Sequence, residues 1–278
     1  AVSNANTPIL DSSVLLHSLE YAATLGLLVF LQAKDPWLDS LGVMHEGAAS
    51  IRQGLGGIPS ASEQIGLARD LELVKTAGAR AHFRTVSTEQ AALRVEEAKK
   101  EGLNVSSDVG INHLHLCDQD VRNFNGLHRI DPPLRSSTDK SGLRRALNQG
   151  IIDAITPHHE PHDHDAKNTP FASSEPGISG FDTFVPLGLE FVDKEGLSIA
   201  TFIRVASTTP AQILGLGSHG IAVSNPADIC IIDPHKVWTV TPDTMNSLGK
   251  NTPYQGQDMK GLVTHTLVHG ELVYEVSE

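Results

Sequence analysis

Cysteine is scarce in this sequence of 278 residues, which contains only Cys117 and Cys230. The two lie far apart and lack the spacing of a metal site, so they fit a reducing cytoplasm without requiring one. No apolar run is long enough to span a membrane, and the N-terminus has neither the basic start nor the apolar core of a signal peptide. We therefore expect a cytoplasmic protein that does not associate with membranes.

Basic residues are also in the minority, with 21 Lys and Arg against 33 Asp and Glu and a formal net charge of -12. Such a field repels nucleic acids, which argues against a broad nucleic-acid surface but leaves local basic pockets open. No nucleophile elbow, phosphate-binding glycine loop or Cys/His nucleophile pair is present. The apolar and charged fractions are ordinary for a soluble globular protein.

The first two thirds of the chain alternate amphipathic helices with short apolar strands, and glycine follows each helix. This rhythm predicts a parallel sheet with crossover helices. Four helix-strand units are half of a (β/α)8 barrel, and no strand of any length precedes the first helix, so we expect an upstream part of the barrel. The predicted helices begin at Ser12 and cover 61–76, 88–100 and 140–149; the predicted strands are LLVFLQA, ARAHFRTVS, LNVSSDV and IIDAIT.

The pattern changes after Leu216 to short alternating strands separated by Gly, Pro and Asn, in HGIAVSNPADICIIDP, KVWTV and GLVTHTLVHGELVYEV. A loop-rich stretch over 157–180 and a helical segment to about Leu214 precede it. We predict two domains: a partial barrel over 1–216 and a small β-sandwich-like domain over 217–278.

The segment ITPHHEPHDHDAKNTPF concentrates His158, His159, His162 and His164 directly after a predicted strand. Active sites of (β/α)8 barrels lie at the C-terminal ends of strands, and imidazole is a zinc ligand. The spacing matches no closed structural zinc site, so the alternative is a solvated loop that binds metal opportunistically. We expect no native metal in these four histidines.

Three further features have both a structural and a functional interpretation. His82 and Thr85 point to opposite faces of a predicted strand, and His82 is either a ligand or a hydrogen-bonded structural group. Arg135, after a Pro-Pro pair, is suited to clamp a carboxylate but equally to brace a loop. Ser60 and Glu63 have the spacing of a capping box at a helix start.

Several motifs in one order resemble those of dihydroorotases and their relatives in the amidohydrolase superfamily. They are HF-x-x-VST, AKKEGLNVSSDV-x-x-NHLHL, DPPLRS, IDAITPHHEPH, PGISGFDTFVPL, TTPAQILGL and NPADICIIDP, and they extend over essentially the whole chain. The resemblance implies the C-terminal half of a (β/α)8 barrel. In that family, metal ions activate water for reversible opening of the dihydroorotate ring, and the first two histidine ligands lie upstream of this chain.

The resemblance also implies that four family positions at the metal centre are replaced. Ala5 stands where a bridging carboxylate or modified lysine is expected, Gln32 and Thr85 where histidines are expected, and His158 where the catalytic aspartate is expected. An alanine donates nothing, and a neutral amide is a poor zinc ligand. We therefore expect no catalytic residues and no cofactor.

Substrate-contacting elements are partly retained. Asp131 stands where an asparagine is frequent, and its carboxylate would repel an anionic substrate. The resemblance extends to inactive dihydroorotase-like subunits that assemble with aspartate carbamoyltransferase in some bacteria. It thus implies a pseudo-enzyme of pyrimidine biosynthesis in a homo- or hetero-oligomer with that partner. The retained residues, the candidate ligand contacts among them, are Pro132, Pro133, Arg135, His159, Pro176 and Gly177.

Two alternatives remain. The first is an active cyclic amidohydrolase with an altered zinc site built from His82, His158, His159, His162 and upstream residues. The second is a sensor of carboxylated pyrimidines in which Arg135 and His159 hold the anion.

Overall fold

A computed structural model describes residues 1–5, 7–217 and 220–276. Its centre is a five-stranded sheet with the order β1-β2-β5-β6-β7, in which every neighbouring pair is parallel. The parallel sheet is the one that the sequence predicts. The strands are β1 (Val2–Ser3), β2 (Leu28–Leu31), β5 (Arg80–Phe83), β6 (Val105–Gly110) and β7 (Ala154–Thr156).

Two details of the predicted strands are wrong. The two-residue strand β1 precedes the first helix and pairs with Val29 and Phe30 of β2, so the sheet has five strands and not four. The strand predicted over ARAHFRTVS ends at Phe83, and Thr85 lies beyond it with φ at 50°. Thr85 is therefore part of the loop at the strand end and not on a strand face opposite His82.

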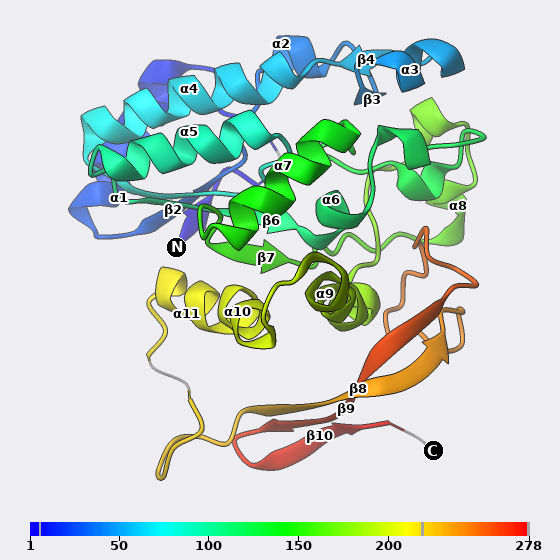
Figure 1. Ribbon diagram of the computed structural model, residues 1–278. Coiled ribbons are helices and arrows are strands. Elements are labelled where there is room, and N and C mark those ends of the chain that lie inside the picture. The colour runs from blue at the N-terminus through cyan, green and yellow to red at the C-terminus, as the bar shows by residue number, and fades with distance from the viewer. Residues whose placement is uncertain (6, 218–219, 277–278) are drawn as a thin grey trace.

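The long helices follow the strands and cover the sheet (Figure 1). Helices α4, α5 and α7 lie side by side above it in this view, whereas α9, α10 and α11 lie below β7. The sheet-flanking helices are α1 (Ser12–Thr24), α4 (Ser60–Ala77), α5 (Glu89–Lys100), α7 (Ser137–Asn148), α9 (Phe181–Glu195), α10 (Ile199–Ile203), the π-helical turn η4 (Arg204–Thr208) and α11 (Thr209–Leu214).

Short elements occupy the loops at the C-terminal ends of the strands. They include the two-stranded parallel ladder of β3 (Met44–His45) and β4 (Gly57–Ile58). The others are α2 (Pro36–Asp39), α3 (Ala48–Gln53), α6 (Ile111–His115), η1 (Asp118–Asp120), η2 (Gly126–His128), α8 (His164–Lys167) and η3 (Phe171–Ser173).

The main hydrophobic core lies between the sheet and its helices. Helix α5 contributes Ala91, Ala92 and Val95, each with no measurable exposure, because its apolar residues share one face. A second, smaller core under the short loop elements includes Met44, Phe171 and Ile178. The loops that surround the strand ends therefore have a packed foundation of their own.

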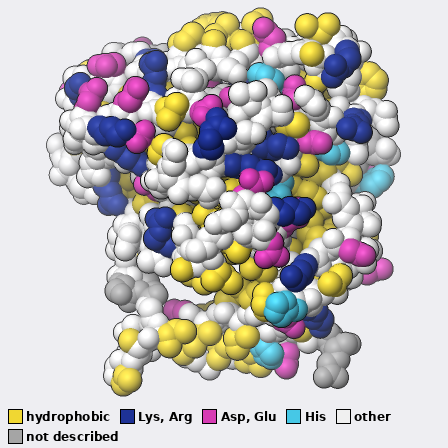
Figure 2. Space-filling model, viewed as in Figure 1, with side chains coloured by type: hydrophobic (Ala, Val, Ile, Leu, Met, Phe, Trp, Pro, Cys, Tyr) yellow, Lys and Arg dark blue, Asp and Glu magenta, His cyan; other side chains and the backbone are white. Residues whose placement is uncertain are grey.

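The C-terminal segment forms an antiparallel sheet with the order β10-β9-β8. Its strands are β8 (Ile229–Thr239), β9 (Asp258–Val268) and β10 (Glu271–Glu275), and β9 packs against α9. Hydrophobic side chains lie exposed along this sheet at the bottom of Figure 2. Val268, Leu272 and Val273 of β9 and β10 are exposed large hydrophobic residues. In the predicted strand HGIAVSNP, 220–226 is not strand and His219 lies outside the described residues. The domain boundary at 217 stays a prediction.

No helix in the described part of the chain is both long and apolar enough to cross a lipid bilayer.

Helix α4 packs closely on the segment after β2 because Gly66 has no side chain. A β-carbon at Gly66 would lie 2.5 Å from the backbone nitrogen of Lys34, which cannot move away as a side chain would. We expect Gly66→Ala to lower the free energy of unfolding by about 1–3 kcal/mol, the usual cost of overpacking. Urea unfolding of both proteins measures this loss of free energy. Gly217→Ala is the matched control, since no atom lies within 4 Å of the added methyl group; equal losses in both variants would contradict the prediction.

Candidate functional site

The four positions at which the resemblance implies replaced metal-centre residues lie at the C-terminal ends of strands of the central sheet. Ala5, Thr85 and His158 follow β1, β5 and β7, and all three have positive φ values, of 50°, 50° and 45°. Few non-glycine residues adopt this conformation. Gln32 follows β2 and is buried, and its backbone nitrogen donates to the Asn4 side chain at 3.2 Å. The backbone thus turns in the same way at three of the four strand ends.

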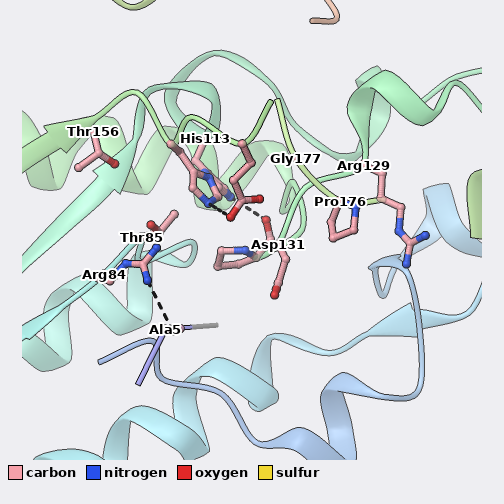
Figure 3. Close-up of polar contacts among 12 residues, drawn as sticks. Ala5, Arg84, Thr85, His113, Arg129, Asp131, Thr156, Pro176 and Gly177 are labelled. Carbon is pink, nitrogen blue, oxygen red and sulfur yellow. Dashed lines mark hydrogen bonds and ion pairs between the residues drawn. The ribbon is translucent and has the colours of Figure 1, made fainter. Parts of the chain in front are cut away.

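A pocket of about 270 Å³ opens at the ends of β5, β6 and β7. Figure 3 shows Arg84 beside Ala5 at the edge of this pocket. Arg84 Nη1 donates to the Ala5 carbonyl oxygen at 3.5 Å. The pocket is the candidate site, and we call it the strand-end pocket. It is lined by Arg84, Thr85, Asp108, Thr156, Pro157, His158, His159, Glu160 and Phe181.

A buried carboxylate, Asp108 of β6, forms the floor of this pocket. Its Oδ2 lies 2.9 Å from His82 Nε2, and its Oδ1 accepts from the Thr85 nitrogen at 2.9 Å and from Thr156 Oγ1 at 3.2 Å. Burial alone would raise the pKa of Asp108, but the hydrogen bonds from His82 and Thr85 outweigh it and lower the pKa. His82 Nδ1 contacts Ser106 Oγ at 2.7 Å, so both nitrogens of His82 have partners.

His158 stacks on His113 behind the pocket, with their ring centroids 5.9 Å apart. His158 Nε2 lies 3.8 Å from a Glu160 oxygen, and His113 Nε2 donates to the Pro132 carbonyl at 3.0 Å. Burial lowers the pKa of both imidazoles, that of His113 to about 3. Both are therefore neutral near pH 7, and neither Nδ1 atom has a partner among the described residues.

The histidines of the predicted cluster have different surroundings. His159 Nδ1 accepts from the backbone nitrogens of Gly180 and Phe181 at 3.2 and 3.3 Å, which places its proton on Nε2. His162 Nε2 donates to the Pro176 carbonyl at 2.9 Å, and His164 is exposed. Within the described ranges, no group of three or more His, Cys, Asp or Glu side chains is arranged to hold a metal ion.

Asn251 connects the loops of the pocket, although its sequence segment predicts only a loop. Its buried side chain accepts from the His162 nitrogen at 2.8 Å and donates to the Glu160 and Gly177 carbonyls at 3.0 Å. Its own carbonyl accepts from the Ser179 nitrogen at 2.8 Å. Retained Pro176 and Gly177 therefore have backbone roles in the same arrangement: their carbonyls accept from His162 and Asn251.

Arg135 is buried below the loops and is not among the residues that line the pocket. Its Nε donates to Ser87 Oγ and its Nη1 to the Ile58 carbonyl, each at 3.0 Å. These contacts are those of a loop brace, and a role as anion ligand stays a prediction. The predicted capping box is wrong: Glu63 points into the interior, where it accepts from the Ser87 nitrogen at 2.7 Å.

Lys34 changes the charge expected around Asp131. Its amine lies 2.8 Å from Asp131 and 3.0 Å from Asp39. The repulsion predicted between Asp131 and an anion is therefore offset by a paired cation. No local sequence pattern indicates this pair, because 97 residues separate its members.

Comparison with known proteins agrees with this architecture. The amidohydrolase family matches residues 2–273, and the chain belongs to that family. Within it, the chain is 38% identical to a dihydroorotase-like protein of Pseudomonas putida and 37% identical to a dihydroorotase of Trichlorobacter lovleyi, in each case over 99% of this chain and 64% of the relative. It thus spans a little less than two thirds of their length.

Solved structures show the same fold. L-Hydantoinase (dihydropyrimidinase) from Arthrobacter aurescens superimposes with a TM-score of 0.87 over the whole chain and 64% of its own length, at 23% identity. The fold is therefore that of the amidohydrolases, a parallel α/β sheet with an antiparallel C-terminal sheet. Whether the chain represents only the C-terminal half of the barrel stays a prediction.

The residues at the strand ends do not fit the metal centre that the family implies. Ala5 has no donor atom and Gln32 offers only a neutral amide. Thr85 offers a hydroxyl, and His158 offers a neutral imidazole where the resemblance implies a carboxylate. The nearby carboxylate of Asp108 already accepts from three groups. Among the four strand-end side chains, a dication would find no anionic ligand to balance its charge.

The contacts of Asn251 predict its importance for stability. We expect Asn251→Ala to cost about 2–4 kcal/mol, because it removes three hydrogen bonds and leaves buried backbone groups unpaired. Chemical denaturation measures the loss, and amide hydrogen exchange at His162 should accelerate. Asn246→Ala, at an exposed side chain in the same region, should change stability by less than about 0.5 kcal/mol. Similar effects of the two variants would refute the role of Asn251.

The pKa of His113 predicts a loss of stability in acid. It is about 3 in the folded chain against 6.5 for the free imidazole, so the unfolded chain takes up the proton first as the pH falls. The free energy of unfolding should decrease from pH 6.5 downward, by about 1.4 kcal/mol per pH unit for one proton. Urea unfolding between pH 7.5 and 4.5 tests this. His113→Phe should have a shallower slope, and identical slopes would show that His113 is not responsible.

Proposed function

We propose that this chain belongs to a dihydroorotase-like protein that has lost metal-dependent catalysis and acts as an assembly subunit for aspartate carbamoyltransferase in pyrimidine biosynthesis. The observation that carries the proposal is the chemistry at the strand ends: Ala5, Gln32, Thr85 and His158 keep the positions of a metal centre but not its donor atoms.

Metal-assisted ring opening needs a cation that lowers the pKa of water and a group that handles the proton. The strand-end residues of this chain supply neither. The neutral imidazole of His158 lies in place of the catalytic carboxylate, with burial holding its pKa down. Asp108 is a poor general base, because its hydrogen bonds lower its pKa.

The hydrophobic core and the buried hydrogen bonds of the fold are intact, which favours a role in protein assembly that depends on the shape of the chain. The main core extends across the sheet and its helices, and the buried pair of Asp108 and His82 is fully hydrogen-bonded. The name of the Pseudomonas putida relative, a dihydroorotase-like protein, is compatible with such a role. The carbamoyltransferase partner is drawn from the resemblance in the sequence motifs.

The competing function is an active cyclic amidohydrolase with an altered zinc site. It would use His82, His158, His159 and His162 with upstream residues. The contacts of these side chains oppose it: His82 is held between Ser106 and Asp108, and His162 is hydrogen-bonded to a backbone carbonyl. These histidines would need to leave their partners to reach one ion.

Zinc content and dihydroorotase activity, measured together on the full-length protein after incubation with zinc, test the loss of catalysis. We expect substoichiometric zinc and no ring opening or closure above background, in both the unmodified protein and His158→Ala. An authentic dihydroorotase assayed in parallel controls for the assay. Near-stoichiometric zinc with activity that disappears in His158→Ala would overturn the proposal and make His158 a functional ligand.

The assembly role is tested separately by co-expression with aspartate carbamoyltransferase from the same organism. We expect the two to elute as one complex in size-exclusion chromatography, and the carbamoyltransferase expressed alone to elute as a smaller, less stable species. Unchanged size and thermal stability of the carbamoyltransferase without this protein would contradict the role.

A further inference from the structure

A second hollow, of about 380 Å³, lies between α3 and the loop that follows η1. It shares no lining residue with the strand-end pocket. We call it the arginine pocket. It is lined by Ala49, Arg52, Gln53, Gln119, Val121, Arg122 and Asn123.

The charge of the arginine pocket is opposite to that of the chain as a whole. Two guanidinium groups, those of Arg52 and Arg122, line it, and no carboxylate does. Arg122 Nε donates to the Gln119 carbonyl at 3.2 Å, which holds this guanidinium at the wall. Within the described residues, the Arg52 guanidinium makes no hydrogen bond or ion pair. It acts electrostatically on Asp118, which is buried outside the lining and has its pKa raised by burial.

Gln53 forms another part of the wall. Gln53 Nε2 donates to the Val121 carbonyl at 2.8 Å, which fixes the orientation of the amide. Its Oε1 has almost no accessible surface, so this oxygen lies behind the wall and does not face the hollow.

The backbone beside the arginine pocket is strained. Asn123 and Phe124 both have positive φ values, of 53° and 55°, in succession. Asparagine tolerates this conformation, but phenylalanine rarely adopts it. Residues held in this way are concentrated at ligand clamps and switches. The strained turn places Asn123 in the lining and leaves the Phe124 ring more than half exposed.

We propose that the arginine pocket binds a small oxyanion, a phosphate or carboxylate compound. Guanidinium groups bind such anions through paired N–H donors. The hollow has the size of a metabolite site, for which about 300–1,000 Å³ is usual, and not that of a single ion.

Titration with anions at constant ionic strength tests the proposal. The anions are inorganic phosphate, glycerol 3-phosphate and malonate. Binding is followed by calorimetry and by the melting temperature, which a ligand of the folded state must raise. We expect saturable binding, with glycerol 3-phosphate tighter than malonate if the ligand is a phosphate compound. Tighter binding of a hydroxylated dicarboxylate such as malate than of glycerol 3-phosphate would assign the ligand to the carboxylates.

Matched variants locate the binding. Arg52→Gln and Arg122→Gln should each weaken it by about tenfold or more, the usual effect of losing a hydrogen bond to a charged group. Arg204→Gln, at an exposed arginine of η4, should leave it unchanged. Melting temperatures without anion show that the variants are folded, and Arg52→Lys and Arg122→Lys replace any that are not. Absence of saturable binding by all four anions, or binding that survives loss of both arginines, would overturn the proposal.

Discussion

The arrangement of the strand ends depends on one buried carboxylate. Asp108 accepts from His82 on β5, from the backbone at Thr85 just beyond it, and from Thr156 at the end of β7. A carboxylate buried to this extent is tolerated only when donors surround it. Because the donors come from both neighbouring strands, the same contacts that keep Asp108 ionised also fix where those strands end and turn.

The pocket above Asp108 is consequently well ordered. Its His158 imidazole is neutral near pH 7, and the Asp108 carboxylate accepts hydrogen bonds from three protein donors. The left-handed turns at Ala5, Thr85 and His158 lie where the resemblance in sequence implies a metal centre. In this chain, packing and hydrogen bonds maintain the backbone at these strand ends.

Much of the fold follows from local patterns in the sequence. Helical periodicity and the glycines after the helices predict the parallel sheet, because both signals lie within a few residues. Strand β1 has only two residues, too few for any periodicity. The pairing of Lys34 with Asp131 and the interior position of Glu63 depend on residues distant in sequence, and no local pattern encodes such contacts. Asn251 was missed for the same reason.

Asn251, between β8 and β9, supports the strand-end pocket although it is not among the residues that line it. The pocket is lined only by residues up to Phe181, yet the carbonyls of Glu160 and Gly177 and the amide of His162 all rely on a side chain some seventy to ninety positions later. During synthesis on the ribosome, this wall stays incomplete until the segment after Leu248 has emerged. A segment translated well after the pocket residues thus completes the wall of their pocket.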